Sequence, residues 1–447
     1  MMEFLGMIGL LVSLVVLIYL TMKGVNIIIG AIISSVIVAL TGGLRLDTAL
    51  MDNYMTGFTG YFASWFFVFL LGAIFGKIMQ ETKSADSIAH WIKKILGPKR
   101  AVFAVVAAAA IMTYGGVSLF VVGFAVYPIA VSLFRSANLP HRFIPAALVF
   151  GSISFTMTAP GSPEIQNIIP TEFFGTTPTA GGWIGVVCAL LIMTLGGLWL
   201  GSMVKKAFAS GETFALPNGE GEAAASMEAN AIKQESDPQK EDLPNIIISS
   251  IPLVLVIVVL NVLGQFMNPT IALLIALLIG IVVACLTMLR FLTKFWDSLA
   301  TGAQNALVAL ANTCAVVGFG SVAAQVSAFD SIITGLVNLP GPPLIGLAIG
   351  VTVICAITGS ASGGLGIALP ILAPIYLAQG LDPGSMHRIS ALASGGLDSL
   401  PHNGYVVTTV RAICGESHGR AYKPILMVSV VLPTIILALA VILYTIF

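Results

Sequence analysis

The stretch Thr358-Gly359-Ser360-Ala361-Ser362-Gly363-Gly364 interrupts an apolar segment in the second half of the chain, and Thr113-Tyr114-Gly115-Gly116 interrupts a similar segment in the first half. Each cluster is followed by a His-Arg dipeptide, which begins at His141 in one half and at His387 in the other. A second interruption follows each dipeptide, at Pro160-Gly161-Ser162-Pro163 and at Pro401-His402-Asn403-Gly404. Interrupted hydrophobic segments at matching positions in two halves indicate a secondary transporter and the location of its binding site.

The composition supports a membrane protein. Of 447 residues, 57% are hydrophobic and only 9% are charged, whereas soluble domains have about 25% charged residues. This balance is typical of a polytopic α-helical membrane protein with the lipid bilayer as its partner. The formal net charge is zero, so no nucleic-acid partner is expected. The five cysteines are scattered without metal-ligand spacing, and we predict neither a metal site nor another cofactor.

Apolar runs of about 20 residues predict the individual spans. They lie at 4–22, 26–42, 60–80, 143–168, 181–204, 246–266, 269–289, 303–325, 388–410 and 424–446. Two longer apolar stretches, 101–134 and 343–379, contain the Gly-rich clusters. Each would form either a re-entrant hairpin or two closely turned spans. Residues 84–96 predict an amphipathic helix at the cytoplasmic interface.

The distribution of basic residues predicts the topology. Lys and Arg gather between residues 77 and 100, at Lys205-Lys206 and between residues 411 and 423. These groups fall on one side, the cytoplasmic side, if both termini lie outside. Residues 1–206 and 245–447 would then form two inverted-topology repeats. The stretch 207–244, which holds eight of the 20 acidic residues, is predicted to be a polar cytoplasmic linker.

The four interruptions are the candidate binding site. A broken helix within a membrane offers free N–H groups and the positive end of its dipole, which suit an anion. No Lys or Arg lies inside any of the four, so N–H groups and small polar side chains would hold that anion. The candidate ligands are Gly115, Gly116, Ser118, Thr156, Thr158, Ser162, Ser360, Ser362, Gly363, Gly364, Ser394 and Asn403. Alternatively, these small residues only allow close helix packing.

Three ionisable residues lie in or beside the interruptions, namely Glu164, Asp398 and His402. Ionisable residues within membranes are candidates for coupling to protons. Asp398 precedes His402 by four residues, so on a continuous helix the two would share a face. Alternatively, they form a buried polar pair that fixes the break, and Glu164 could simply be solvated near the outer end of its segment. The chain has no nucleotide-binding or hydrolase motif, which argues against an enzyme and leaves an ion or solute gradient to drive transport.

Three runs resemble the gluconate permease family of the ion-transporter superfamily: Thr113-Tyr114-Gly115-Gly116-Val117-Ser118-Leu119-Phe120-Val121, Thr158-Ala159-Pro160-Gly161-Ser162-Pro163 and Ser394-Gly395-Gly396-Leu397-Asp398-Ser399-Leu400-Pro401-His402-Asn403-Gly404. The resemblance implies proton symport of small carboxylates and two re-entrant hairpins. It also implies an elevator-type movement of a transport domain against a dimeric scaffold, hence a homodimer. The Tyr114-Gly115-Gly116 turn and the Pro160–Pro163 break depart from the gluconate carriers and indicate a divergent branch.

The sequence therefore predicts a proton-coupled importer of a small hydroxy-monocarboxylate, such as gluconate or 3-hydroxybutyrate, in a bacterial inner membrane. Asp398, His402 and Glu164 are the candidates for proton coupling. A sodium-coupled di- or tricarboxylate symporter of the same architecture is the main alternative, because carbonyl-rich breaks can also hold sodium. An anion channel is a further alternative, and a membrane-embedded enzyme that uses His402 and Asp398 is the least favoured.

Overall fold

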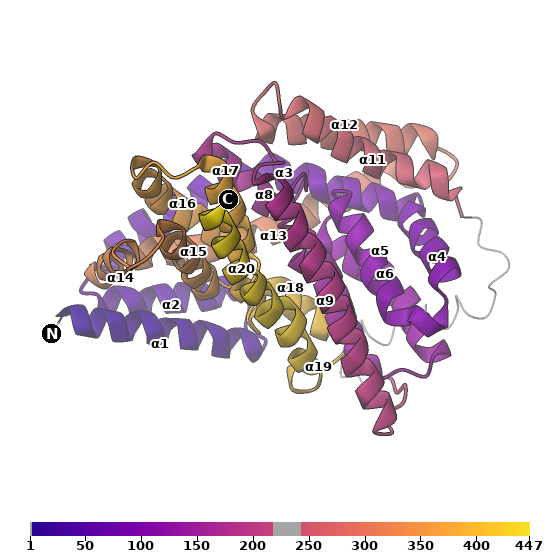
Figure 1. Ribbon diagram of the computed structural model, residues 1–447, viewed down its shortest axis with the longest axis horizontal. Coiled ribbons are helices and arrows are strands. Elements are labelled where there is room, and N and C mark those ends of the chain that lie inside the picture. The colour runs from indigo at the N-terminus through magenta and orange to yellow at the C-terminus, as the bar shows by residue number, and fades with distance from the viewer. Residues whose placement is uncertain (1, 218–242) are drawn as a thin grey trace.

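The computed structural model describes residues 2–217 and 243–447, and this part of the chain is helical without β-strands. Most of the predicted linker, 207–244, lies outside the described residues. Eight helical runs among those described are long and apolar enough to cross a membrane. The prediction of an all-α polytopic membrane protein is confirmed (Figure 1).

The order of elements before residue 218 recurs after residue 242. The first set consists of α1 (Met2–Met22), α2 (Ile27–Thr41), α3 (Met55–Glu81), α4 (Ser84–Leu96), α5 (Ala101–Tyr114), α6 (Leu119–Ser136), α7 (Ile144–Val149), α8 (Ile165–Phe174) and α9 (Gly182–Ala209). The second consists of α11 (Ile246–Leu263), α12 (Pro269–Thr287), α13 (Phe295–Ala323), α14 (Ser327–Val337), α15 (Pro343–Thr358), α16 (Ala361–Ala378), α17 (Pro383–Ser394), α18 (Gly404–Val407), α19 (His418–Ile425) and α20 (Leu432–Ile446).

Several helix boundaries follow from local sequence. Asn26, Asn245 and Asn268 cap α2, α11 and α12, because each side-chain oxygen accepts a hydrogen bond from a main-chain N–H in the first turn. Pro269 occupies the first turn of α12, where its missing N–H costs nothing. The predicted amphipathic helix at 84–96 is confirmed as α4. It buries Ile88 and Ile92 and exposes Trp91.

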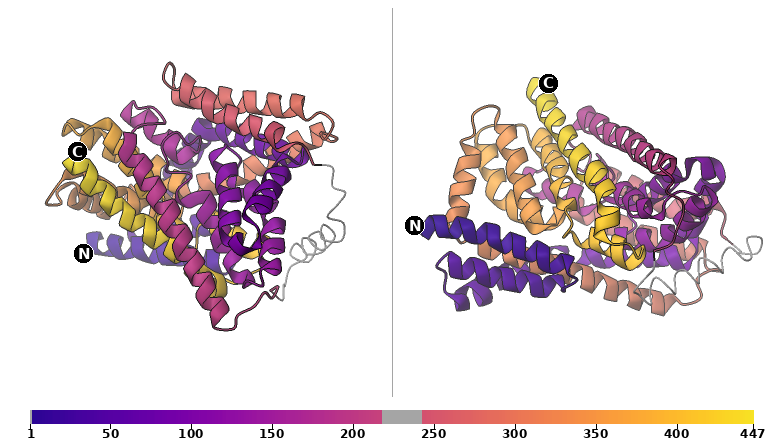
Figure 2. Two further views of the ribbon diagram at one scale, coloured as in Figure 1. Left: turned by 45° about the vertical axis from the view of Figure 1, so that its right-hand side comes forward. Right: turned by 90° about the horizontal axis from the view of Figure 1, so that it is seen from below.

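The long helices α3 and α13 pack along each other at the centre of the molecule. α12 packs against α3, and α2 packs against α13. The pair α1–α2 and the pair α11–α12 lie at opposite sides of the molecule, as Figure 1 and the left view of Figure 2 show. The short helix α4 contacts α11, and α14 contacts α1, so each half of the chain reaches across to the other.

Both stretches that contain a Gly-rich cluster fold as helical hairpins. α5 turns into α6 at residues 115–118, and α15 turns into α16 at Gly359 and Ser360. The 14 residues of α5 extend about 21 Å, which is less than the roughly 30 Å of the hydrocarbon core. The first limb of the hairpin at 101–134 is therefore too short to cross the hydrocarbon core, whereas α6 has 18 residues.

The spans expected at 143–168 and 388–410 are discontinuous. The first runs through α7 and the π-helical residues Phe150–Ser154, stops, and resumes as α8. The second stops after α17 and resumes as α18, which continues as a π-helix through Ile413. α16 of the second hairpin packs against α8, and α6 of the first hairpin packs against Thr408–Ile413. The four interruptions are thereby brought together.

Candidate functional site

A cavity of about 500 Å³ lies where the two hairpin tips and the two helix breaks meet. Gly116 and Ser118 line it from the first tip, and Ser360 and Ser362 line it from the second. Glu164, Asp398 and Asn403 line it from the breaks. The volume falls in the range of about 300–1,000 Å³ that is usual for small-molecule sites. Residues from both halves of the chain therefore share one candidate site.

Four helices begin at this cavity. The residues immediately before α6, α8, α16 and α18 are Ser118, Glu164, Ser360 and Asn403, and all four line it. The first N–H groups of a helix have no partner within the helix and carry a partial positive charge. The cavity is thus surrounded by four sets of N–H groups, although it has no fixed cation.

The N-terminal residues differ in how they use their side chains. Ser360 Oγ accepts a hydrogen bond from the Gly363 N–H at 3.2 Å, and Asn403 Oδ1 accepts one from the Val406 N–H at 2.9 Å. Neither Ser118 nor Glu164 caps its own helix. The Ser118 hydroxyl and the Glu164 carboxyl are therefore not used in capping and are available to the cavity.

The two acidic residues that line the cavity come from different breaks. Glu164 precedes α8, and Asp398 lies in the short turn after α17. Ser399 Oγ donates a hydrogen bond to Asp398 Oδ1 at 2.9 Å. Among the described residues that line the cavity there is no Lys, Arg or His. Glu164 lines the cavity together with Ile165, the first residue of α8.

His402 lies behind the second hairpin tip and does not line the cavity. A methyl group placed on Gly359 would lie 2.2 Å from His402 Cδ2, so the imidazole packs directly against this glycine. Gly359 has a φ of +59°, a left-handed conformation that favours glycine. Leu400 is extended with ψ 164°, which interrupts any helix between Asp398 and His402. The two residues therefore do not share a helix face, and only Asp398 reaches the cavity.

The remaining predicted ligands lie in the walls of the breaks without lining the cavity. Gly115 packs against Leu253 of α11, and Gly364 packs against Cys355 of α15, each too closely to admit a Cβ. Gly363 lies in the first turn of α16. Ser162 Oγ accepts a hydrogen bond from the Glu164 N–H at 3.3 Å. The hydroxyls of Thr156, Thr158 and Ser394 donate to carbonyls of their own preceding turns.

The cavity also has a wall that the sequence interpretation missed. Asn305, Asn312 and Thr313 of α13 line it, as do Val68, Phe69 and Gly72 of α3. Asn305 and Asn312 are seven residues apart, which is two helical turns and places them on one face. Two amides on one face of an otherwise apolar span were a detectable signal. The prediction missed them because it considered only the interruptions.

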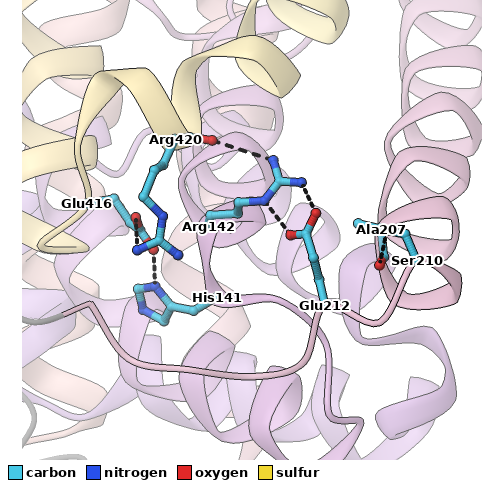
Figure 3. Close-up of polar contacts among 7 residues, drawn as sticks. All are labelled: His141, Arg142, Ala207, Ser210, Glu212, Glu416 and Arg420. Carbon is cyan, nitrogen blue, oxygen red and sulfur yellow. Dashed lines mark hydrogen bonds and ion pairs between the residues drawn. The ribbon is translucent and has the colours of Figure 1, made fainter.

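The first His-Arg dipeptide connects its broken helix to the other half of the chain (Figure 3). His141 Nδ1 lies 2.9 Å from Glu416 Oε1, and both side chains are fully buried. Arg142 donates to both carboxylate oxygens of Glu212 at 2.7 and 2.8 Å. Arg420 lies 3.7 Å from the second oxygen of Glu416.

The second dipeptide makes equivalent connections in the opposite direction. His387 Nδ1 lies 2.6 Å from Thr176 Oγ1, and its Nε2 lies 3.2 Å from Asn167 Oδ1. Arg388 is completely buried and donates to the carbonyls of Thr158, Pro178 and Ala180. Both dipeptides therefore join the two halves of the chain around the breaks.

An all-helical membrane protein with paired hairpins and broken helices around one cavity has the architecture of a secondary transporter. Residues 5–397 match the sequence profile of a family described as GntP family permease. The chain is 35% identical to the uncharacterised transporter YxjC of Bacillus subtilis (strain 168) over 94% of this chain and 95% of that protein. It is 26% identical to an uncharacterised permease of Haemophilus influenzae over 57% of this chain and 50% of that protein.

Two solved transporters share the fold at 15% sequence identity. The Alcanivorax borkumensis YdaH transporter, described as having an unusual topology, matches with a TM-score of 0.56 over 89% of this chain and 87% of its own. Neisseria gonorrhoeae MtrF, described within a class of antimetabolite efflux pumps, matches with a TM-score of 0.52 over 89% and 83%.

The chain belongs to the GntP permease family, which confirms the family predicted from its sequence. It is therefore a multi-pass membrane transporter and not an enzyme.

Proposed function

We propose that this protein is a proton-coupled symporter that imports a small hydroxy-monocarboxylate. The observation that carries the proposal is the convergence of four helix N-termini on one cavity without a Lys, Arg or His in its described lining. Partial positive charges on main-chain N–H groups favour an anion. An anion with a single carboxylate can be accommodated there without a fixed cationic partner.

Proton coupling follows from the two carboxyl groups in the same cavity. A bound anion and an ionised Glu164 or Asp398 repel each other across a site of low dielectric. Protonation of either carboxyl removes that repulsion and favours anion binding. By linkage, anion binding favours protonation to the same extent. The proton and the substrate anion would therefore bind together, as symport requires. His402 packs against Gly359 at the tip of the second hairpin. It would respond to the position of this hairpin and would not contact the substrate.

The recurring order of elements supports the wider arrangement that we propose. Residues 1–206 and 245–447 would be inverted-topology repeats with re-entrant hairpins, and residues 207–244 would be a cytoplasmic linker. The hairpins and broken helices would move together as an elevator-type transport domain. α3 and α13 would belong to a scaffold that forms a homodimer. Both termini would lie outside a bacterial inner membrane.

Uptake by the purified protein in liposomes tests the proposal. Labelled gluconate and labelled 3-hydroxybutyrate would be offered separately, each under an inward proton gradient and under an inward sodium gradient. We expect proton-driven accumulation of at least one acid. Uptake that requires sodium and ignores pH would support the sodium-coupled alternative. Flux that does not saturate and is not stimulated by substrate on the far side would indicate a channel.

Variants of the cavity carboxyls test the coupling separately. We expect Glu164→Gln or Asp398→Asn to reduce proton-driven accumulation while allowing exchange of substrate across the membrane. Glu172→Gln is the matched control, because Glu172 is an exposed acid on α8 outside the cavity. His402→Ala is likewise predicted to abolish accumulation and spare exchange. Loss of both would make His402 a binding or folding residue.

A further inference from the structure

Two long helices, α3 and α13, line the cavity, and the lining residues of α3 are apolar or glycine except for Gln80. On α13, Asn305, Asn312 and Thr313 line it. Gly76 precedes Asp86-Ser87-Ile88 by ten residues, and Gly320 precedes Asp330-Ser331-Ile332 by the same spacing. In this register Val68 of α3 corresponds to Asn312 and Phe69 to Thr313. Val68 and Phe69 line the same cavity. Positions that correspond between the halves therefore face one space but differ in chemistry.

The amides of α13 are not needed to hold the helix in place. Asn312 is half-buried and Asn305 is exposed, and neither side chain makes a hydrogen bond to another described residue. By contrast, Asn261 of α11 donates to the Gly161 carbonyl at 2.9 Å and so has a structural role. An amide in a membrane span is costly unless water or a ligand satisfies it. The amides of α13 are consequently available to a ligand in the cavity.

Asn312 and the four helix N-termini belong to different elements. The N-termini belong to the hairpins and broken helices, whereas Asn312 lies near the middle of α13. A substrate held by its carboxylate at the N-termini would present the rest of its chain to α3 and α13. An apolar carbon chain suits Val68 and Phe69, while a hydroxyl group suits an amide, which can both donate and accept a hydrogen bond.

We propose that Asn312 is a specificity-determining residue that binds a hydroxyl group of the transported acid. This inference rests on the proposed function. We assign a hydroxyl of the substrate to Asn312, and not a second carboxylate. The described residues that line the cavity include Glu164 and Asp398 but no Lys, Arg or His. A second carboxylate would add repulsion that Asn312 does not offset. Thr313 and Asn305 of the same helix also line the cavity and extend its polar surface.

Transport of matched acids by the reconstituted protein tests this assignment. The initial rates of uptake of 3-hydroxybutyrate and of butyrate, which differ by one hydroxyl, would be measured for the wild type and for Asn312→Val. We expect the wild type to prefer the hydroxylated acid. Asn312→Val should raise KM for 3-hydroxybutyrate by about tenfold, the value of one net hydrogen bond. It should change the KM for butyrate much less, because butyrate has no hydroxyl to lose.

Gln304→Leu is the matched control. Gln304 is an exposed amide of the same helix that does not line the cavity, and its replacement should leave both KM values unchanged. Asn312→Ser provides a second variant that retains a hydroxyl for hydrogen bonding. It should raise KM for 3-hydroxybutyrate less than Asn312→Val does, and it serves as the test if the valine variant is not recovered as monodisperse protein.

The outcomes separate the inference from the proposed function. Wild-type uptake of carboxylates without preference for the hydroxylated acid would overturn the role of Asn312 and leave the symporter intact. An equal change in KM for both acids, or none, in Asn312→Val would also overturn it. Wild-type protein that transports neither these acids nor gluconate under either gradient would remove the proposed function, and this inference with it.

Discussion

The His-Arg dipeptide at 141–142 lies just before α7 and the one at 387–388 lies within α17, and the two dipeptides meet different partners. In the first half, His141 and Arg142 meet the carboxylates of Glu416 and Glu212. In the second, His387 meets a hydroxyl and an amide, and Arg388 meets only main-chain carbonyls among its hydrogen-bond partners. The first dipeptide contacts carboxylates, whereas Arg388 of the second fixes the path of the main chain.

Burial explains why the two arginines differ. The Arg142 side chain is 23% exposed and Glu212 is 41% exposed, so water also solvates that pair. Arg388 is 0% exposed and reaches the carbonyls that border the first helix break. Several rigid, fanned N–H donors let one guanidinium bind several carbonyls at once. Arg388 therefore fixes the main chain beside the first helix break, whereas Arg142 makes a partly exposed ion pair with Glu212.

Replacing Arg388 should have the largest effect. Arg388→Ala leaves the carbonyls of Thr158, Pro178 and Ala180 without this donor in a buried setting. We expect a loss of about 3 kcal/mol or more, because each unsatisfied buried group costs about 1–3 kcal/mol. Thermal unfolding of the purified protein in detergent would measure it. Arg388→Lys should not restore the stability, because one ammonium group cannot donate to the three carbonyls in the geometry of a guanidinium. If Arg388→Ala and Arg142→Ala were equally stable, burial would not explain the difference between the two arginines.

Replacing Glu416 should have the next largest effect. Glu416→Ala removes the buried partner of His141, and we expect a loss of about 2 kcal/mol, typical of a buried hydrogen bond broken on one side. Glu416→Gln keeps an acceptor in place and should cost less. The same unfolding assay compares them. If the glutamine variant is as unstable as the alanine variant, charge and not hydrogen bonding holds the first dipeptide.

Much of the fold could be predicted because its signals are local. Apolar runs located the spans, and the charged and apolar faces of residues 84–96 gave α4 with matching bounds. The Gly-rich clusters gave the hairpin turns, because glycine permits the left-handed conformation found at Gly116 and Gly359. Each of these features depends on residues within a few positions of one another.

The site was predicted less completely because side-chain direction depends on packing. Ser118, Ser360 and Asn403 line the cavity, whereas the Thr158 and Ser162 side chains turn to neighbours in the first break. The partners of the two dipeptides are about 200 or more residues away in several cases, as with His141 and Glu416, separated by 275 residues. No local sequence pattern predicts such contacts.

A smaller effect is expected at the hydroxyl partner of the second dipeptide. Thr176→Val removes the group that lies 2.6 Å from His387 Nδ1. We expect a loss of about 1 kcal/mol, because Asn167 still contacts the other ring nitrogen. Thr177→Val is the control, since its hydroxyl contacts only that of Thr179 at 3.1 Å. Equal unfolding temperatures for the two variants would show that His387 does not depend on this neutral partner.

The smallest effect concerns the exposed pair of the first dipeptide and depends on pH. Hydrogen bonds from Arg142 lower the pKa of Glu212 below its ordinary value of 4.5. Because the pKa is lower in the folded protein, the stabilisation is fully present above the ordinary pKa and is lost as the pH falls through the folded value. Its size should be about 0.2–1 kcal/mol, as for other exposed pairs. Glu212→Gln should therefore be slightly less stable than the wild type at pH 7, and the difference should vanish at strongly acidic pH. A difference that persists in acid would mean that Glu212 acts through packing and not through its charge.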